Sequence, residues 1–255
     1  MPLNLSKSAG IPLILSGMIP IIKTDLNHPE KEIKKYNDYK KFFKDSSLDK
    51  NINLYYVYRN YCLNKDKAIF KKYGVRYDVT VIGKEIVGKE APHTIGHIHK
   101  QNSQGLRQNE IYQVISGSAL FLLHDTKNKL FWVIKRTKGQ KIIIPGHCAH
   151  IIVNNLPQKP LVIANIFTNK KNSSDYSFFK KTSGPAWYPI RNGTKINFLK
   201  NSSYKKSVSL RLVKKINLPF GISSNRSLYL DFIKNPLKFS FLAQPTVINT
   251  KNIFV

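Results

Sequence analysis

The sequence contains little cysteine. Its 255 residues include two cysteines, Cys62 and Cys148, and no CxxC motif. Two cysteines cannot form the disulfide framework of a small secreted domain, and they offer no paired thiolates for a metal. We therefore expect a protein of a reducing compartment, the cytoplasm.

Acidic residues are also scarce. The chain has 14 aspartates and glutamates against 42 lysines and arginines, so its formal net charge is +28. A field of this sign attracts anions such as nucleic acid, an anionic membrane or a phosphorylated metabolite. The basic residues do not gather into one block with interleaved aromatics, and no helix-turn-helix or RNA-recognition motif is visible. We therefore expect no nucleic-acid partner.

The chain lacks an apolar run long enough to span a bilayer. The stretch GIPLILSGMIPII, residues 10–22, superficially resembles the core of a signal peptide. Pro12 and Pro20 interrupt it, no small-x-small cleavage site follows, and it is too short to cross a membrane. We interpret it as an extended segment that packs on the domain, and we expect no membrane partner.

Enough apolar residues are present to build a large core. Hydrophobic residues make up 42% of the chain, and 14 Phe and 13 Tyr are among the aromatic residues, which argues against disorder. The best helical pattern begins at Pro29, where a first turn tolerates proline, and Ile33, Tyr36 and Tyr39 follow at helical spacing. This pattern predicts a helix near residues 29–46.

The pattern changes from residue 53 onward. Short runs rich in β-branched and aromatic residues, such as EIYQVISGSALFLLHD and PLVIANIF, alternate with turn signals such as DTKNK and NLPQKP. Many short strands at close spacing indicate an all-β sandwich or barrel. We predict an N-terminal extension (residues 1–50), a barrel (residues 51–195) and a C-terminal extension (residues 196–255) that packs on the barrel or on a partner subunit.

Histidines are concentrated in one part of the chain. Six of the seven lie between His93 and His150. His97 and His99 point to the same side if they lie on a strand, whereas Glu110 and His150 belong to two further predicted strands. Three imidazoles and one carboxylate suit a borderline divalent cation, with coordination positions left for a substrate. A lone HxH motif would more simply be a core histidine pair, so the wider spacing has to decide.

The wider spacing resembles the two motifs of the cupin superfamily. Glu110 is followed by six residues and then Gly117, and Gly139 is followed by five residues and then Pro145, with His150 further on. This resemblance implies an all-β cupin fold, the double-stranded β-helix or jelly-roll barrel, with the N-terminal helical and extended segment and the C-terminal extension outside it.

Longer segments resemble the cupin-type, archaeal-style glucose-6-phosphate isomerases. They are VGKEAPHTIGHIH (87–99), EIYQVISG (110–117) and PGHCAHIIVN (145–154), with LYYVYR, RYDVTVI and SDY in the expected order. The resemblance covers most of the predicted barrel. It implies metal-dependent interconversion of glucose 6-phosphate and fructose 6-phosphate, a phosphorylated sugar as substrate, and a homodimer.

The resemblance also implies roles for individual residues. One divalent metal ion per chain, Fe²⁺ first and Zn²⁺, Mn²⁺ or Ni²⁺ as alternatives, is expected on His97, His99, Glu110 and His150. The residues expected around the sugar phosphate are Tyr55, Thr80, Thr94, Gly96, Tyr112 and Tyr176. Hydroxyls and a backbone N–H at the glycine can donate to phosphate oxygens, and Lys89 is close enough in sequence to add positive charge.

The chain departs from the family pattern at four points. The connection between His99 and Glu110 is longer than usual, and His147 replaces an expected glycine. Phe167 stands where related enzymes often have a tyrosine, and Ser174 where they sometimes have a histidine. The first two changes fall in predicted turns, where insertion is tolerated. The last two leave the group that opens the sugar ring unassigned.

Glu110 is the candidate catalytic base. In an enediol route, a base carries a proton between C2 and C1 while a metal or a hydrogen bond stabilises the oxygens. A carboxylate that binds a cation tightly is a weaker base, so a metal-assisted hydride shift stays open. The motifs also leave open another metal-dependent cupin enzyme, such as a mannose-6-phosphate isomerase or an iron oxygenase, and a non-catalytic sugar-phosphate-binding cupin.

Overall fold

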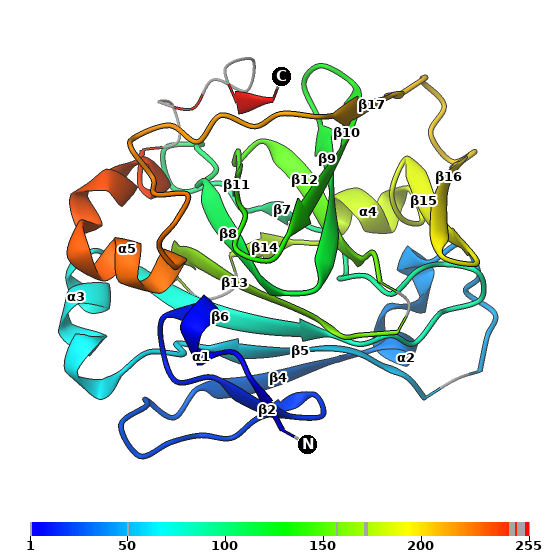
Figure 1. Ribbon diagram of the computed structural model, residues 1–255. Coiled ribbons are helices and arrows are strands. Elements are labelled where there is room, and N and C mark those ends of the chain that lie inside the picture. Colours follow the sequence, from blue (N-terminus) through cyan, green and yellow to red (C-terminus); the bar gives the residue numbers. More distant parts are fainter. Residues whose placement is uncertain are drawn as a thin grey trace.

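Two β-sheets face each other at the centre of the molecule (Figure 1). The computed structural model describes residues 2–49, 51–156, 158–170, 173–244, 248 and 253–254. The six-stranded sheet has the order β11-β8-β13-β6-β5-β4 and contains β4 (Glu30–Lys35), β5 (Asn53–Arg59), β6 (Val75–Ile82), β8 (Glu110–Ser116), β11 (Lys141–Ile144) and β13 (Leu161–Thr168). The four-stranded sheet has the order β12-β9-β10-β17 and contains β9 (Ser118–Asp125), β10 (Leu130–Thr137), β12 (Cys148–Asn154) and β17 (Ser209–Val213).

Smaller elements surround the two sheets. The remaining strands are β1 (Leu3–Asn4), β2 (Ile14–Ser16), β3 (Ile19–Pro20), β7 (Ile98–His99), β14 (Ser174–Asp175), β15 (Trp187–Asn192) and β16 (Lys195–Lys200). The α-helices are α1 (Ser6–Ala9), α2 (Tyr36–Tyr39), α3 (Lys67–Lys72), α4 (Ser177–Lys181) and α5 (Leu228–Lys234), and the 3₁₀ helices are η1 (Lys40–Phe42), η2 (Asn64–Asp66) and η3 (Pro236–Leu242). Within the described residues, no helix is long and apolar enough to cross a membrane.

The order of the strands is that of a jelly roll. The chain passes from β8 in the larger sheet to β9 and β10 in the smaller one, returns to β11, crosses to β12 and returns again to β13. Neighbouring strands within each sheet are antiparallel, except that β17 runs parallel to β10. The predicted all-β cupin architecture is therefore confirmed. Each sheet keeps two free edges among the described strands, so the fold is a sandwich rather than a closed barrel.

Both faces of the larger sheet are covered, so two hydrophobic cores form. Between the sheets, Tyr112 of β8 packs against Phe121 of β9 with ring centroids 5.7 Å apart. On the outer face, Tyr77 of β6 packs against Tyr229 of α5 with ring centroids 5.2 Å apart. Because successive side chains of a strand point to opposite faces, a strand between two cores is buried along its whole length. All eight residues of β6 are buried accordingly.

Segments outside residues 51–195 complete the outer core. The apolar N-terminal stretch is extended as expected, and its β2 pairs with β1 and β3. Figure 1 shows α5 beside α3, where Phe70 and Phe232 stack at 4.8 Å. The Tyr229 hydroxyl donates to Asp66 and accepts from the backbone N–H of Leu63. Since β4 and β17 also lie outside residues 51–195, both extensions contribute strands to the sheets.

The predicted helix over residues 29–46 is wrong in its first part. Residues Glu30–Lys35 form strand β4, which pairs antiparallel with β5. Only Tyr36–Tyr39 are α-helical, followed by one 3₁₀ turn. Helical spacing of aromatic residues is a local signal, whereas β4 gains a ladder of hydrogen bonds from the sheet and an ion pair between Glu32 and Arg59. Tertiary pairing overrides the local pattern here.

His124 makes the stability of this fold depend on pH. Its ring is buried among Phe131, Phe178 and Tyr204, and its Nδ1 has no hydrogen-bond partner in the described part of the chain. Burial lowers the pKa of His124 from 6.5 to about 4, although Asp125 opposes the shift. Between these two pH values, His124 is protonated in the unfolded chain and neutral in the folded chain. The free energy of unfolding therefore falls as the pH falls from 6.5 toward 4.

We expect His124→Phe to lose part of this pH dependence. Urea unfolding of metal-free protein at pH 7 and at pH 4.5 measures the effect. The wild type should lose about 2 to 3 kcal/mol more than the variant between the two pH values. If both proteins lose the same amount, His124 does not contribute to the acid sensitivity of the fold.

Candidate metal centre

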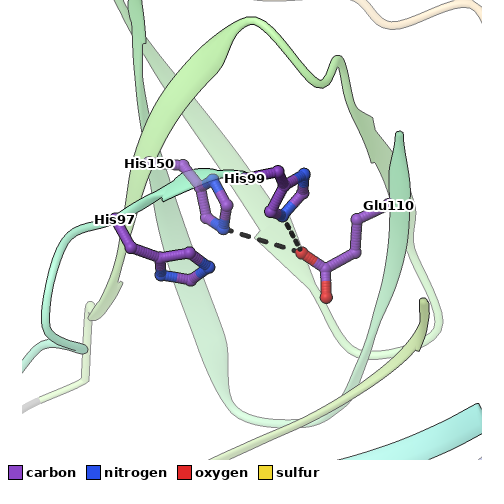
Figure 2. A group of neighbouring side chains, drawn as sticks. All are labelled: His97, His99, Glu110 and His150. Atoms are coloured by element: carbon purple, nitrogen blue, oxygen red, sulfur yellow. Dashed lines mark hydrogen bonds and ion pairs between the residues drawn. The ribbon is translucent and has the colours of Figure 1, made fainter. Parts of the chain in front are cut away.

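Three histidines and one glutamate meet between the two sheets (Figure 2). His97 lies just before β7 and His99 lies in it. Glu110 is the first residue of β8, and His150 lies on β12. One ligand atom from each residue lies within 4.8 Å of the other three. The Glu110 Oε2 atom is 3.0 Å from His99 Nε2 and 3.6 Å from His150 Nε2. The structure therefore brings together all four residues predicted to hold a metal.

Backbone pairing places the histidines. The N–H of His97 donates to the carbonyl of His150 at 3.3 Å, and the N–H of His150 donates back at 2.9 Å. Residues paired directly across a ladder have side chains on the same face, and the two imidazole centroids lie 4.4 Å apart. His99 lies two residues after His97 on the same side, so one bridge between two segments orients three imidazoles.

Neighbouring groups fix the orientation of the ligands. The Nδ1 of His99 lies 2.7 Å from the carbonyl of Gln108 and donates to it, so Nε2 is the ring nitrogen that faces the centre. Phe167 covers the same imidazole at a centroid distance of 4.2 Å. Asn165 donates its Nδ2 to Glu110 Oε1 at 2.7 Å, so the other carboxylate oxygen faces the histidines.

Electrostatics keep the donors ready to bind a cation. Desolvation and the neighbouring imidazoles lower the pKa of His97 well below 6.5, and burial with His99 nearby lowers the pKa of His150 to about 4. Burial alone would raise the pKa of Glu110, but the hydrogen bond from His99 and the charges of both histidines lower it overall. At neutral pH, the imidazoles of His97 and His150 are therefore neutral and the Glu110 carboxylate is ionised.

The donor set fits a borderline divalent cation. Three imidazole nitrogens and one carboxylate oxygen suit Fe²⁺, Zn²⁺, Mn²⁺ or Ni²⁺. The Nε2 of His150 is buried and has no hydrogen-bond partner among the described residues. A buried polar atom without a partner is rare in folded proteins, and a bound cation would satisfy it. His97 is partly exposed, so the centre opens toward a pocket.

A pocket lies next to this centre. Five residues predicted to surround the sugar phosphate line it together with His97, Glu110 and His150: Tyr55, Thr80, Thr94, Tyr112 and Tyr176. Their roles in binding remain predictions. The Tyr112 hydroxyl bonds the Glu110 carboxylate, and burial together with that charge raises the pKa of Tyr112 well above 10, so the hydroxyl stays protonated.

Two other predicted residues are not among those that line the pocket. Gly96 does not line the pocket; a Cβ atom there would overlap Phe179 of α4, so its small size serves packing. Lys89 lies in a separate hollow with Lys44 and Gly88 and does not add charge to this pocket, as the sequence had led us to expect. Closeness in sequence to the histidines did not translate into closeness in space.

The pocket is also lined by polar and charged residues that were not predicted from the sequence. They include Lys34, Arg59, Arg76, Asp78 and Asn165, and Phe167, noted above as a departure from the family pattern, lines it too. The Asp78 carboxylate accepts hydrogen bonds from Arg76 Nε at 2.7 Å and from Arg59 Nη1 at 3.3 Å. A signal for them was present in the sequence, because residues two apart on a strand share a face. Asp78 and Arg76 thus lie on the same face of β6 as Thr80, the face toward the pocket. Arg59 likewise shares a face of β5 with Tyr55.

We expect His150→Ala to weaken the binding of a divalent cation by at least about 100-fold, since even outer-shell partners of a metal contribute 10- to 100-fold. The matched control is His28→Ala, because His28 is exposed and lies outside the cluster. Calorimetric titration of Zn²⁺ or Mn²⁺ into metal-stripped protein measures both. Equal affinities of the two variants would remove His150 from the ligand set.

Solved structures with detectable similarity match only parts of this chain. Vicilin from Capsicum annuum is 12% identical over 48% of this chain and 29% of its own, with a TM-score of 0.34. Oxalate decarboxylase from Bacillus subtilis is 15% identical over 48% of this chain and 27% of its own, with a TM-score of 0.35. The matched region therefore spans less than a third of each of these two chains. No curated protein matches the sequence.

A family model gives a longer match. The model described as glucose-6-phosphate isomerase (GPI) matches residues 33–206. This range runs from within β4 to beyond β16 and contains all four residues of the metal cluster and all residues that line the pocket. The chain therefore belongs to the glucose-6-phosphate isomerase (GPI) family.

Proposed function

We propose that this protein interconverts glucose 6-phosphate and fructose 6-phosphate in a metal-dependent reaction. The observation that carries the proposal is the cluster of His97, His99, Glu110 and His150 at a polar pocket, in a chain of the glucose-6-phosphate isomerase family. The three histidines and Glu110 would hold one divalent cation, with Fe²⁺ the first candidate. When bound, such a cation supplies Lewis-acid polarisation of substrate oxygens.

The charge of the pocket suits a phosphorylated sugar. Its lining contains three cations, Lys34, Arg59 and Arg76, against two carboxylates, Asp78 and Glu110. A divalent cation at the centre would add to this positive balance. A sugar phosphate is an anion, and a water-restricted pocket of opposite sign both attracts and orients it.

Glu110 is the group proposed to move the proton. Its lowered pKa keeps the carboxylate ionised at neutral pH, as a base must be. Asn165 and Tyr112 hold it by hydrogen bonds, so it has a fixed orientation against the substrate. Glu110 would take the proton from C2 of the open-chain aldose and return it to C1. In a hydride shift, Glu110 would serve only as a ligand, and the hydrogen would pass directly between the two carbons.

The competing functions differ in what they require of the pocket. An iron oxygenase needs an open coordination position but no recognition of phosphate, so the positive lining favours a sugar phosphate over such substrates. A mannose-6-phosphate isomerase needs the same charge and differs only in which epimer it accepts at C2. A non-catalytic binding protein has no need of a buried base beside the metal ligands.

A direct assay tests the proposed function. The purified protein is stripped with EDTA, reloaded separately with Fe²⁺, Mn²⁺, Ni²⁺ or Zn²⁺, and supplied with fructose 6-phosphate. We expect glucose 6-phosphate to form in a coupled assay with at least one metal, and not in the stripped protein. Formation of mannose 6-phosphate alone would change the assignment, and no turnover with any of the four metals would reject it.

We expect Glu110→Gln to lower kcat by at least about 100-fold while the fold stays intact, because the amide cannot accept the proton. Circular dichroism checks the fold, and the metal content of the variant separates loss of the base from loss of the cation. Turnover of the wild type in D₂O gives an independent readout. Deuterium at C2 of glucose 6-phosphate supports proton transfer, whereas complete retention of the original hydrogen indicates a hydride shift.

A further inference from the structure

Lys34 is a buried lysine at the pocket, and neither the sequence motifs nor the metal cluster assigns a role to it. It is 7% exposed and lies on the edge strand β4. It pairs directly with Tyr55 of the neighbouring strand β5, so both side chains lie on the pocket side of the sheet. A buried lysine is rare unless it is paired, and such burial calls for an explanation.

The ammonium of Lys34 has one donor left over. It contacts Glu32 Oε1 at 2.5 Å and donates to the Tyr39 hydroxyl at 3.0 Å. These are its two acceptors among the described residues, whereas an ammonium carries three N–H donors. Burial alone would lower the pKa of Lys34, but the bonds to Glu32 and Tyr39 raise it above its ordinary value, so the group stays charged.

The other two cations of the pocket are both bound to carboxylates. Each guanidinium nitrogen of Arg59 has a carboxylate partner, either Glu32 or Asp78. Arg76 donates to Asp78 and to a backbone carbonyl, and it lies over the ring of Phe167, which covers the metal ligand His99. Arg76 therefore belongs to the metal end of the pocket, whereas Lys34 lies on the edge strand β4 and has two acceptors among the described residues for its three N–H donors.

Lys34 and the metal centre both lie next to the ring of Tyr176. The centroid of this ring is 5.6 Å from Lys34 Nζ and 5.8 Å from the centroid of His97. Strand β4 is separated from β8, which carries Glu110, by three other strands. A six-carbon sugar that reacts at C1 and C2 carries its phosphate on C6, and therefore presents that phosphate away from the metal.

We propose that Lys34 binds the phosphate group of the substrate through its remaining N–H donor. This inference rests on the proposed function, which supplies the sugar phosphate. The Glu32 carboxylate competes with the phosphate for the Lys34 ammonium, because it holds the ammonium in place and neutralises part of its charge. Lys34 thus determines specificity for a phosphorylated over an unphosphorylated sugar, at a distance from the atoms that react.

Calorimetry with inorganic phosphate and steady-state kinetics with fructose 6-phosphate, both on metal-loaded protein, test the proposal. We expect Lys34→Met to raise the Kd for phosphate by about 10- to 100-fold, the loss typical of a hydrogen bond to a charged group. KM for fructose 6-phosphate should rise by a similar factor with kcat little changed, because this contact is equally present before and during the reaction. Lys34→Arg should recover most of the affinity.

The neighbouring Lys35 supplies the matched control. It is exposed, so Lys35→Met removes the same charge from the same strand without changing the pocket, and it should behave as the wild type. Unchanged phosphate affinity and unchanged KM in Lys34→Met would overturn the proposal. Lys34-dependent phosphate binding in a protein that isomerises fructose 6-phosphate with none of the four metals would reject the proposed function and leave the anion site standing.

A second variant decides the case in which Lys34→Met does not fold. Glu32 is a third exposed at the sheet edge, so Glu32→Gln is expected to fold. Without the competing carboxylate, phosphate affinity should rise by about two- to fivefold, the range typical of a partly exposed ion pair. Unchanged or weaker affinity in this variant would overturn the role of Lys34.

Discussion

The site depends on the contacts between one buried carboxylate of the six-stranded sheet and imidazoles carried by strands outside that sheet. Glu110 belongs to the six-stranded sheet and His150 to the four-stranded one, while His99 is attached to His150 through the backbone bridge at His97. Removing an ionised carboxylate from water is unfavourable unless its oxygens find partners. Here His99 and Asn165 provide hydrogen bonds and the imidazole of His150 lies 3.6 Å away, so the ligands assemble only when the sandwich closes.

The C-terminal segment reaches this site from the outside. Asn109, directly before Glu110, donates to the carbonyl of Phe241 in η3 and accepts from the N–H of Gly146. A side chain at Gly146 would overlap the carbonyl oxygen of Arg107, so the two turns pack backbone to backbone. The long connection after His99, which departs from the family pattern, is thus held by a segment that the family match does not cover.

Much of the site was predictable because strands impose a simple rule. Residues two apart on a strand share a face, so the HxH pair predicts two imidazoles on one side. The cupin motif spacings then place Glu110 and His150 on two further strands of the same site. The helix predicted over residues 29–46 fails for the opposite reason. Its residues Glu30–Lys35 have no strong local preference that outweighs pairing with β5, and the edge of a sheet is not visible in the sequence around it.

The sequence by itself determined the ligand types, the all-β class and the family, because these depend on residue identity and short spacings. Only the tertiary structure decided which charges reach the pocket. Lys89 stands near the histidines in sequence and lies in another hollow, whereas Lys34 stands 63 residues before His97 and lies next to the same tyrosine ring as His97. The order of strands in a sheet sets such distances, and that order arises from long-range hydrogen bonding that a one-dimensional pattern does not contain.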